Sequence, residues 1–301
     1  MAKDVTLRQL RYFAAAAETG QFSMAAAQAH VSQSAITIAV ALLEQSLGVR
    51  LCDRLPHGVT LTAAGHNFLQ HARHVLDSLQ DALREPRFQA HGLTGSVRIG
   101  ATYTVLGYFL PALLARFRMQ YPDVEIDLYD MDRAGIEQAV SAGEIELGVL
   151  ILSNLPARAR FGHHVLMRSR RQLWTSASHP LLELESPSLA DIARYPFLQI
   201  TQDEAEAATL RYFKAKRLRP DVAFRTGSME ALRGLIAHGF GVTILSDMVY
   251  RPWSLEGKKI EARPIHDIVP DMEAGLVWRP KGALAPPADA LRQFLIHACG
   301  S

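Results

Sequence analysis

Cysteine and long apolar runs are scarce in this sequence. It has only 2 cysteines among 301 residues, Cys52 and Cys299, and their wide separation argues against a disulfide framework or a cysteine metal site. A reduced, cytoplasmic setting is therefore expected. No apolar run approaches the roughly 18 residues that a membrane-spanning helix needs, and the first residues lack the apolar core of a secretion signal. We expect no membrane partner.

A surplus of charge is also absent. The 32 Lys and Arg residues nearly balance the 30 Asp and Glu residues, and the formal net charge is +2. An anionic partner would therefore have to be bound by local groups rather than by the field of the whole chain. Apolar residues make up 49% of the sequence, which is enough to form a core and argues against disorder. The length allows two ordinary domains.

The sequence lacks the signatures of several enzyme classes. It contains no GxSxG, no P-loop, no HExxH and no GxGxxG after a strand. His71 and His74 lie one helical turn apart, but no third ligand stands at a suitable spacing, so a solvated or interface position is favoured over a metal site. We expect no catalytic residue, no bound metal and no cofactor.

The N-terminal part of the chain has the pattern of helices almost throughout. Thr6, Ser23 and Ser32 each precede an apolar run and are predicted to cap helices. Residues 51–62 hold a Pro-His-Gly turn between two short β-prone pieces, which predicts a small hairpin, or wing. Thr62 opens an apolar-periodic helix of about 24 residues. We expect this helix to pair with a second one, because no local core covers its apolar stripe.

Residues 32–48, SQSAITIAVALLEQSLG, combine a polar first turn with an apolar stem. Four apolar residues recur at the spacing of one helix face: Ile36, Val40, Leu43 and Leu47. Gly48 is a typical helix stop. Three polar residues beside the predicted cap project from the exposed tip: Gln33, Ser34 and Thr37. A core helix has no need of such a tip, so the pattern indicates a helix that points its N-terminal end at a partner.

The two short helices, the tight turn between them and the hairpin together predict a winged helix-turn-helix that binds double-stranded DNA. The second helix of this motif enters the major groove and places its first residues on base edges. Gln33 suits a bidentate contact to adenine, and Ser34 and Thr37 suit bases or thymine methyl groups. Backbone N–H groups at the helix starts and side chains of the hairpin suit phosphates. These phosphate candidates are Ser23, Ser32, Arg54 and His57.

From Ser96 onward, strands alternate with helices, which predicts open α/β sheets. Strands are expected at 96–101, 124–130, 146–152, 172–177, 196–200, 222–226, 241–246 and 272–279, and helices at 105–120, 132–143, 189–194, 204–217, 228–238 and 288–298. The predicted domains are a DNA-binding domain (1–61), a linker helix and hinge (62–90) and an effector-binding domain (91–301). In the last, lobe one is predicted at 91–163 and 269–301, and lobe two at 164–268.

Ligands of open α/β folds bind at the carboxyl ends of strands, beside helix N-termini. In lobe one that place is Thr102-Tyr103-Thr104, whose hydroxyl and N–H groups suit a carboxylate. In lobe two it is Thr201-Gln202. We therefore expect a small organic acid to bind between the lobes, with Thr102 and Thr104 on its carboxylate.

The run AETGQFSMAAAQAHVSQSAITIAVALLEQSLGVRLCDRLPHGVTLTAAG resembles the N-terminal signature of LysR-type transcriptional regulators. The resemblance involves about fifteen positions at fixed spacing, among them Phe22-Ser23, Ser32-Gln33 and Leu47-Gly48. It implies a cytoplasmic bacterial regulator with an N-terminal all-α winged helix-turn-helix and a long linker helix. It further implies a C-terminal α/β two-lobed effector domain of the type 2 periplasmic-binding-protein fold.

The same resemblance extends to assembly and to the cleft. It implies a homotetramer, a dimer of dimers joined through the linker helices, and makes RNA polymerase a candidate partner. It adds five residues near the cleft: Asp130, Met131, Phe240, Gly241 and Val242. The chain departs from the family pattern at Cys52, Ile38 and His57, where Phe, Arg or Lys, and a basic residue are common. Fewer cationic contacts to phosphates predict a modest DNA affinity with a shallow salt dependence.

Other interpretations stay open at this point. Some enzymes and solute-binding transport proteins share a two-lobed binding fold, although neither class explains residues 6–62. Asp130 near the cleft would also suit an effector that carries an amino group. Glu204 and Glu206 are interpreted as the polar start of a helix and nothing more.

Overall fold

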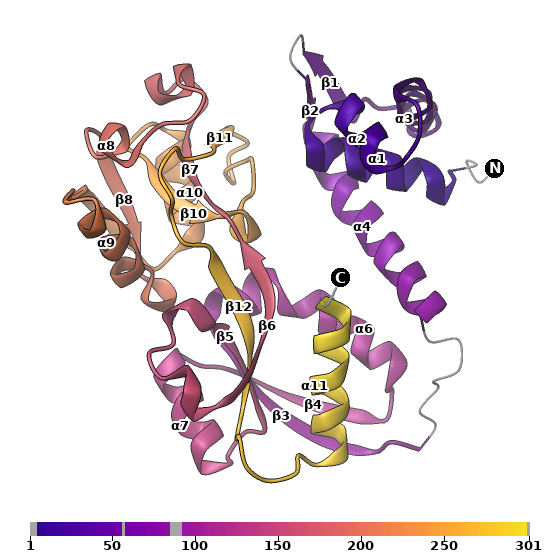
Figure 1. Ribbon diagram of the computed structural model, residues 1–301, viewed down its shortest axis with the longest axis vertical. Helices are drawn as coiled ribbons and strands as arrows, with labels where there is room; N and C mark the ends of the chain where they lie inside the picture. Colours follow the sequence, from indigo (N-terminus) through magenta and orange to yellow (C-terminus); the bar gives the residue numbers. More distant parts are fainter. Residues whose placement is uncertain (1–4, 56–57, 85–91, 300–301) are drawn as a thin grey trace. The chain divides into compact units, whose positions relative to one another are not determined.

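The computed structural model of the chain describes residues 5–55, 58–84 and 92–299 (Figure 1). The chain divides into two compact units, Met1–Phe88 and Gln89–Ser301. Within the described residues, no single helix is long and apolar enough to cross a membrane. The helices Phe22–Gln28 and Gln33–Leu47 reach that length and apolar character only when they are counted together, and a bend of 109° separates them.

The first unit is a helical cluster with a hairpin. Its elements are α1 (Leu7–Thr19), α2 (Phe22–Gln28), α3 (Gln33–Leu47), β1 (Cys52–Leu55), β2 (Gly58–Leu61) and α4 (Ala63–Arg84). The predicted caps at Thr6 and Ser32 are confirmed, because each side chain accepts a hydrogen bond from a backbone N–H group of the first turn. The predicted cap at Ser23 is wrong: Gln21 takes the cap position and α2 begins two residues earlier, at Phe22, which is buried in the core.

The first half of α4 packs on the unit it belongs to. Leu69 and Ala72 are buried in the same apolar cluster as α1, and the Phe68 ring lies 5.6 Å from the Phe13 ring. Further along, Val75 is 43% exposed. The expectation that no local core covers this helix therefore has to be corrected as far as Leu76, which still packs on this cluster, whereas Val75 stays without that cover.

The hairpin is fixed to the helices at its base. β1 and β2 pair antiparallel, with Cys52 opposite Leu61. The Glu44 carboxylate accepts hydrogen bonds from the N–H groups of Leu51 (2.7 Å) and Cys52 (2.9 Å), which ties the entry of the hairpin to α3. Cys52 itself is buried, as expected for a small core residue. The hairpin therefore lies at the position predicted for the wing.

The second unit consists of two lobes. Lobe one, as the structure defines it, is built on a five-stranded sheet in the order β4-β3-β5-β12-β6, with α6 and α11 on one face and α7 on the other. Its elements are β3 (Gly95–Ala101), α5 (Tyr103–Tyr108), α6 (Leu110–Gln120), β4 (Val124–Asp130), α7 (Arg133–Ala142), β5 (Leu147–Ile151), η1 (Leu152–Asn154), η2 (Arg158–Arg160), β6 (Gly162–Ser169), β12 (Met272–Trp278) and α11 (Pro286–Cys299).

Lobe two contains a three-stranded sheet, β10-β7-β11, and the parallel pair β8-β9. Two hydrogen bonds between β8 and Val242, just before β10, join these pieces. Its elements are β7 (Arg171–Ser176), η3 (Pro180–Glu183), α8 (Leu189–Ile192), β8 (Pro196–Ile200), η4 (Gln202–Glu204), α9 (Ala205–Ala215), β9 (Asp221–Thr226), α10 (Met229–Ala237), β10 (Thr243–Ser246), η5 (Asp247–Val249) and β11 (Ile260–Arg263).

Three features differ from the sequence-based expectation. The helix expected at 105–120 is broken at Phe109, where the backbone leaves the helical region, and α6 starts at Leu110 with Pro111 in its first turn. β6, which was not among the expected strands, pairs with β12 along the sheet of lobe one, so this lobe extends to Ser169 rather than to residue 163. The short strand β11 was not expected at all. It forms by antiparallel pairing with the edge of β7.

Candidate functional site

The tip of α3 presents a group of polar side chains. The Ser32 hydroxyl accepts a hydrogen bond from the Ala35 N–H (3.2 Å) and lies 2.9 Å from the Ser34 hydroxyl. Gln33 and Ser34 are exposed, and Thr37 is half-buried. The start of α3 thus carries four side chains with hydrogen-bonding groups, from the cap residue Ser32 to Thr37 in the second turn.

The opposite face of α3 holds the helix in the first unit. Ile36, Val40 and Leu43 are fully buried against α1 and α2. Ile38, two residues along, is 59% exposed. The helix therefore separates a packing face from a face that is free to meet a partner, as its sequence predicted.

The other candidates for DNA contact are described in part. Ser23 is exposed within the first turn of α2. Arg54 lies in β1 and pairs with Val59 through its backbone, but its side chain lies outside the described part of the structure. His57 also lies outside the described residues.

A second candidate site lies between the two lobes of the second unit. Thr102, Tyr103 and Thr104 follow β3 and start α5, as predicted. Thr102 and Thr104 are both buried. The Thr104 N–H donates a hydrogen bond to the Asp203 carboxylate (2.8 Å), which belongs to η4 of lobe two. The predicted carboxylate position in lobe one is therefore in contact with a carboxylate of the chain itself.

Asp203 is held from both sides. The Asn154 amide of lobe one donates a hydrogen bond to its carbonyl oxygen (2.6 Å). Burial raises the pKa of the Asp203 carboxyl above its ordinary value, and hydrogen bonding from Thr104 acts in the opposite direction. Asp203 and Glu204 both have positive φ angles, 53° and 55°, which are rare for residues other than glycine. The η4 segment is thus a strained turn in contact with lobe one.

Further polar contacts connect the lobes around Asp203. The Arg133 guanidinium of α7 forms an ion pair with Glu204 (3.1 Å). On the other side of the contact, the buried Arg233 of α10 donates a hydrogen bond to the Tyr108 hydroxyl (3.1 Å). The lobes therefore meet directly, with charged and polar side chains across their contact.

The space that remains between the lobes is small. A cavity of about 40 Å³ has side chains of both lobes around it. It is lined by Thr104, Ile151, Asn154, Arg171, Ile200, Gln202, Asp203, Ala205, Thr209, Met229, Ile244, Leu245, Ser246, Val249 and Met272. Such a volume holds about three water molecules. In this arrangement the cavity has no room for a drug-sized ligand, whose pockets span about 300–1,000 Å³.

Polar groups of this cavity are only partly satisfied. Within residues 92–299, the Ser246 hydroxyl in its lining has no hydrogen-bond partner, although the residue is almost fully buried. Arg171 donates a hydrogen bond to the Pro270 carbonyl (2.8 Å), and burial lowers the pKa of its guanidinium. A polar ligand would satisfy a group that the folded chain leaves without a partner.

The remaining candidates from the sequence have mixed positions. Gln202 lines the cavity, and its side-chain amide donates a hydrogen bond to the Gly227 carbonyl. Thr201 precedes Gln202, and its backbone N–H donates a hydrogen bond to the Thr226 carbonyl. Asp130 is exposed at the end of β4, and Met131 packs against the apolar cluster of α7. Of the ten candidates, only Thr104 and Gln202 are among the residues that line the cavity; Phe240, Gly241 and Val242 are among the eight that are not.

The structure also adds residues that the sequence did not single out. Asp203, Asn154, Arg171 and Ser246 all line the cavity. One signal was present, since Asp203 directly follows Thr201-Gln202 at the carboxyl end of a predicted strand. Asn154 and Ser246 carried a similar signal, because they lie at the carboxyl ends of the predicted strands 146–152 and 241–246. Arg171 starts β7, where the chain has just left lobe one, and no spacing in the sequence indicates that place.

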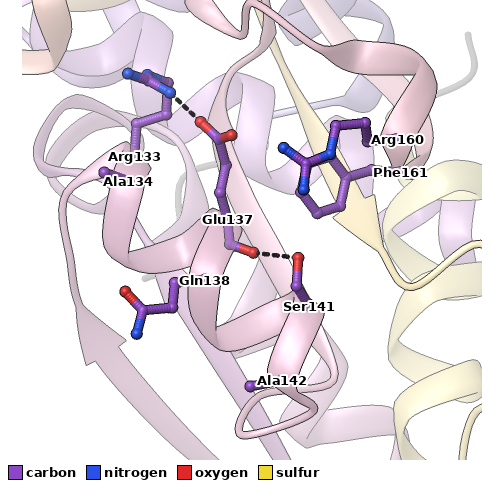
Figure 2. A pocket seen from close by; sticks show the side chains of 8 residues that line it. All are labelled: Arg133, Ala134, Glu137, Gln138, Ser141, Ala142, Arg160 and Phe161. Carbon is purple, nitrogen blue, oxygen red and sulfur yellow. Dashed lines mark hydrogen bonds and ion pairs between the residues drawn. The ribbon is translucent and has the colours of Figure 1, made fainter.

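An open groove of about 590 Å³ runs beside α7 in lobe one (Figure 2). In Figure 2, Arg133 and Glu137 point toward each other as an ion pair, and the Ser141 hydroxyl donates a hydrogen bond to the Glu137 carbonyl (2.7 Å). Arg160 lies beside Phe161 on the other wall. Three of the drawn polar residues of α7, Arg133, Glu137 and Ser141, already bond to one another, so the groove offers less to a ligand than the interlobe cavity does.

Comparison with known proteins agrees with this arrangement. A family model described as the LysR substrate binding domain matches residues 90–300, and one described as a bacterial regulatory helix-turn-helix protein of the lysR family matches residues 7–66. The uncharacterized HTH-type transcriptional regulator YnfL of Escherichia coli (strain K12) is 30% identical over 301 residues, which cover 98% of this chain and 99% of that protein.

Two further relatives are similar over nearly the whole chain. The SDS degradation transcriptional activation protein of Pseudomonas sp. (strain ATCC 19151) is 32% identical over 96% of this chain and 95% of its own length. The crystal structure of a putative LysR family transcriptional regulator from Pseudomonas aeruginosa matches with a TM-score of 0.64 at 26% identity, covering 99% of this chain and 100% of that chain.

The fold and the exposed tip of α3 are those of a DNA-binding transcriptional regulator with an N-terminal helix-turn-helix and a C-terminal substrate-binding domain, and not of an enzyme. The chain belongs to the LysR family of bacterial regulators.

Proposed function

We propose that this regulator reads its operator with the first turn of α3 and that a small organic acid, bound between the two lobes, switches its activity. In this proposal the hairpin acts as the wing of a winged helix-turn-helix. The second unit acts as an effector domain of the type 2 periplasmic-binding-protein kind.

The observation that carries the DNA-reading part is the division of α3 into two faces. The buried face holds the helix rigidly, because Ile36, Val40 and Leu43 are fully buried. The tip then offers Gln33 and Ser34 to the major groove, where a side-chain amide can bond to adenine in a bidentate manner. Ser32 and Thr37 complete the set of proposed contacts, and Ser23, Arg54 and His57 are proposed to contact phosphates.

The effector part rests on the polar groups between the lobes. The Thr104 N–H already binds a carboxylate, and the Ser246 hydroxyl, within the described part of the second unit, has no partner. These groups suit a ligand that carries a carboxylate. Thr201 and Gln202 are proposed to line the same site from lobe two, with Tyr103, Asp130 and Met131 near it and the segment Phe240-Gly241-Val242 further away.

The proposed assembly is a homotetramer, a dimer of dimers, that positions several recognition helices on one operator. The half-exposed Val75 on α4 supports a helix pair as the dimer contact. RNA polymerase is a proposed partner at the promoter. A ligand can switch such an assembly only through its different affinities for two arrangements of the protein.

The DNA-reading part is tested by a matched pair of substitutions on one helix. Gln33→Ala removes the proposed base contact, whereas Gln45→Ala changes an exposed glutamine of the last turn of the same helix. We expect Gln33→Ala to weaken binding to a site selected by the wild-type protein from random DNA by about 1–3 kcal/mol. Fluorescence anisotropy measures both affinities. Equal affinities of the two variants for the selected site would contradict the proposal.

A further inference from the structure

The position proposed for the effector's carboxylate is filled by a carboxylate of the chain. Asp203 reaches from η4 of lobe two to the Thr104 N–H of lobe one, at 2.8 Å. The two groups are 99 residues apart in the sequence and belong to different lobes. The hydrogen bond therefore exists only while the lobes are in contact at this point.

The surrounding space indicates that Asp203 stands in for a ligand. The cavity of about 40 Å³ beside it has no room for a small organic acid of several carbon atoms. Yet within the described second unit the Ser246 hydroxyl, which lines this cavity, is left almost fully buried without a partner. A contact that had only a structural role would satisfy such groups, because each unpaired buried hydroxyl destabilises the fold.

The backbone of η4 is also in an unfavourable conformation. Asp203 and Glu204 are consecutive residues with positive φ angles, 53° and 55°, and neither is a glycine. Residues keep such angles only where their surroundings hold them. Here the surroundings are contacts with lobe one, from Thr104 and Asn154 to Asp203 and from Arg133 to Glu204. Release of these contacts would let η4 relax.

We propose that Asp203 is a built-in competitor of the effector: its carboxylate occupies the effector's carboxylate position, and an effector binds only by displacing Asp203 and moving η4. This inference rests on the proposed organic-acid effector and states how that site is regulated. The displaced segment η4 leads directly into α9. Replacement of the Asp203 carboxylate by that of the effector therefore changes the contact between the lobes. The free energy of releasing Asp203 then lowers the apparent affinity for the effector.

The test compares three proteins in full-length form: wild type, Asp203→Asn, and the control Glu206→Gln. Asp203→Asn keeps the shape and removes the charge. Glu206 is the neighbouring carboxylate, and it pairs with Arg225 within lobe two (2.8 Å), away from lobe one. A thermal-shift screen of small monocarboxylates and dicarboxylates, amino acids and primary amines is followed by calorimetry on the hits. Asp203→Ala, which removes the competing group completely, serves as a second variant.

We expect both Asp203 variants to bind a carboxylate about tenfold or more tightly than wild type, and Glu206→Gln to bind it like wild type. Unchanged or weaker binding in both variants would overturn the competitor role while leaving the organic-acid effector in place. Binding of an amine that is lost in Asp203→Asn would also overturn it, because Asp203 would then be a direct anchor for a cation. Binding of no carboxylate to any of the proteins would contradict the proposed effector class and this inference together.

Discussion

At the scale of single residues, the two isoleucines near the start of α3 have opposite surroundings. Ile36 is fully buried in the core of the first unit, and Ile38 is 59% exposed on the same helix. The side chains are chemically identical and share one backbone conformation. Any difference between them must therefore come from packing rather than from helix propensity.

We expect Ile36→Ala to destabilise the first unit by about 2–5 kcal/mol, because it leaves a cavity among α1, α2 and α3. Ile38→Ala should change the free energy of unfolding by less than about 0.5 kcal/mol. Urea unfolding followed by circular dichroism at 222 nm measures both. A loss of similar size in the two variants would show that the buried face of α3 has been misidentified.

Residue-scale predictions from the sequence succeeded where the cause is local. The caps at Thr6 and Ser32 depend on bonds within one helical turn, and both are present. The cap at Ser23 failed because burial of Phe22 decides where α2 begins. Asp203 could not be assigned its place from the sequence, because its partner Thr104 belongs to the other lobe.

At the scale of elements, one side chain connects the recognition helix to the hairpin. The Glu44 carboxylate of α3 accepts hydrogen bonds from two consecutive N–H groups, those of Leu51 and Cys52, at the start of β1. Leu51 and Cys52 are both buried, so water cannot easily replace the carboxylate. The orientation of the proposed wing relative to α3 depends on this contact.

We expect Glu44→Ala to destabilise the base of the hairpin by about 1–3 kcal/mol, because two buried N–H groups lose their acceptor. Glu44→Gln keeps a carbonyl oxygen and should lose less. Hydrogen exchange of the Leu51 and Cys52 amides, measured by NMR, reports directly on this contact. Protection that stays unchanged in Glu44→Ala would mean that strand pairing alone holds the hairpin.

The boundaries of helices and strands were predictable where the hydrophobic periodicity is strong. They were not predictable where contacts with other elements determine them. Most helices and strands of both units lie at or near the expected residues. The break at Phe109 and the short strand β11 depend on packing and on the edge of β7, which a single sequence does not reveal. The end of lobe one was misplaced for the same reason, because the pairing of β6 with β12 joins distant parts of the chain.

At the scale of the whole molecule, acid should weaken the second unit. Hydrogen bonds from Ser188 lower the pKa of Asp191, and those from Lys216 and Leu189 lower the pKa of Asp267. Groups whose folded-state pKa is lowered stabilise the fold above their ordinary pKa, and this stability is lost as the pH falls through the folded-state value. Burial raises the pKa of Asp203, which acts in the opposite direction and partly offsets the loss on acidification.

We expect the free energy of unfolding of the second unit to fall as the pH drops below about 4. All 3 tryptophans, Trp174, Trp253 and Trp278, belong to this unit, so tryptophan fluorescence of the full chain during urea unfolding reports on it alone. Asp267→Asn should lower stability at neutral pH and reduce the dependence on pH, whereas Asp123→Asn on the surface serves as a control. A wild-type stability that rises between pH 5 and pH 3 would show that the buried carboxyls dominate.

The separation of the two faces of α3 also has an evolutionary consequence. Substitutions at Gln33, Ser34 and Ile38 lie on the exposed face, where most changes alter stability by less than about 0.5 kcal/mol. Each such change can nevertheless alter which base pairs the helix accepts. After a gene duplication, a copy of this regulator could therefore acquire a new set of target promoters by a few substitutions in one helical turn, without passing through an unstable protein.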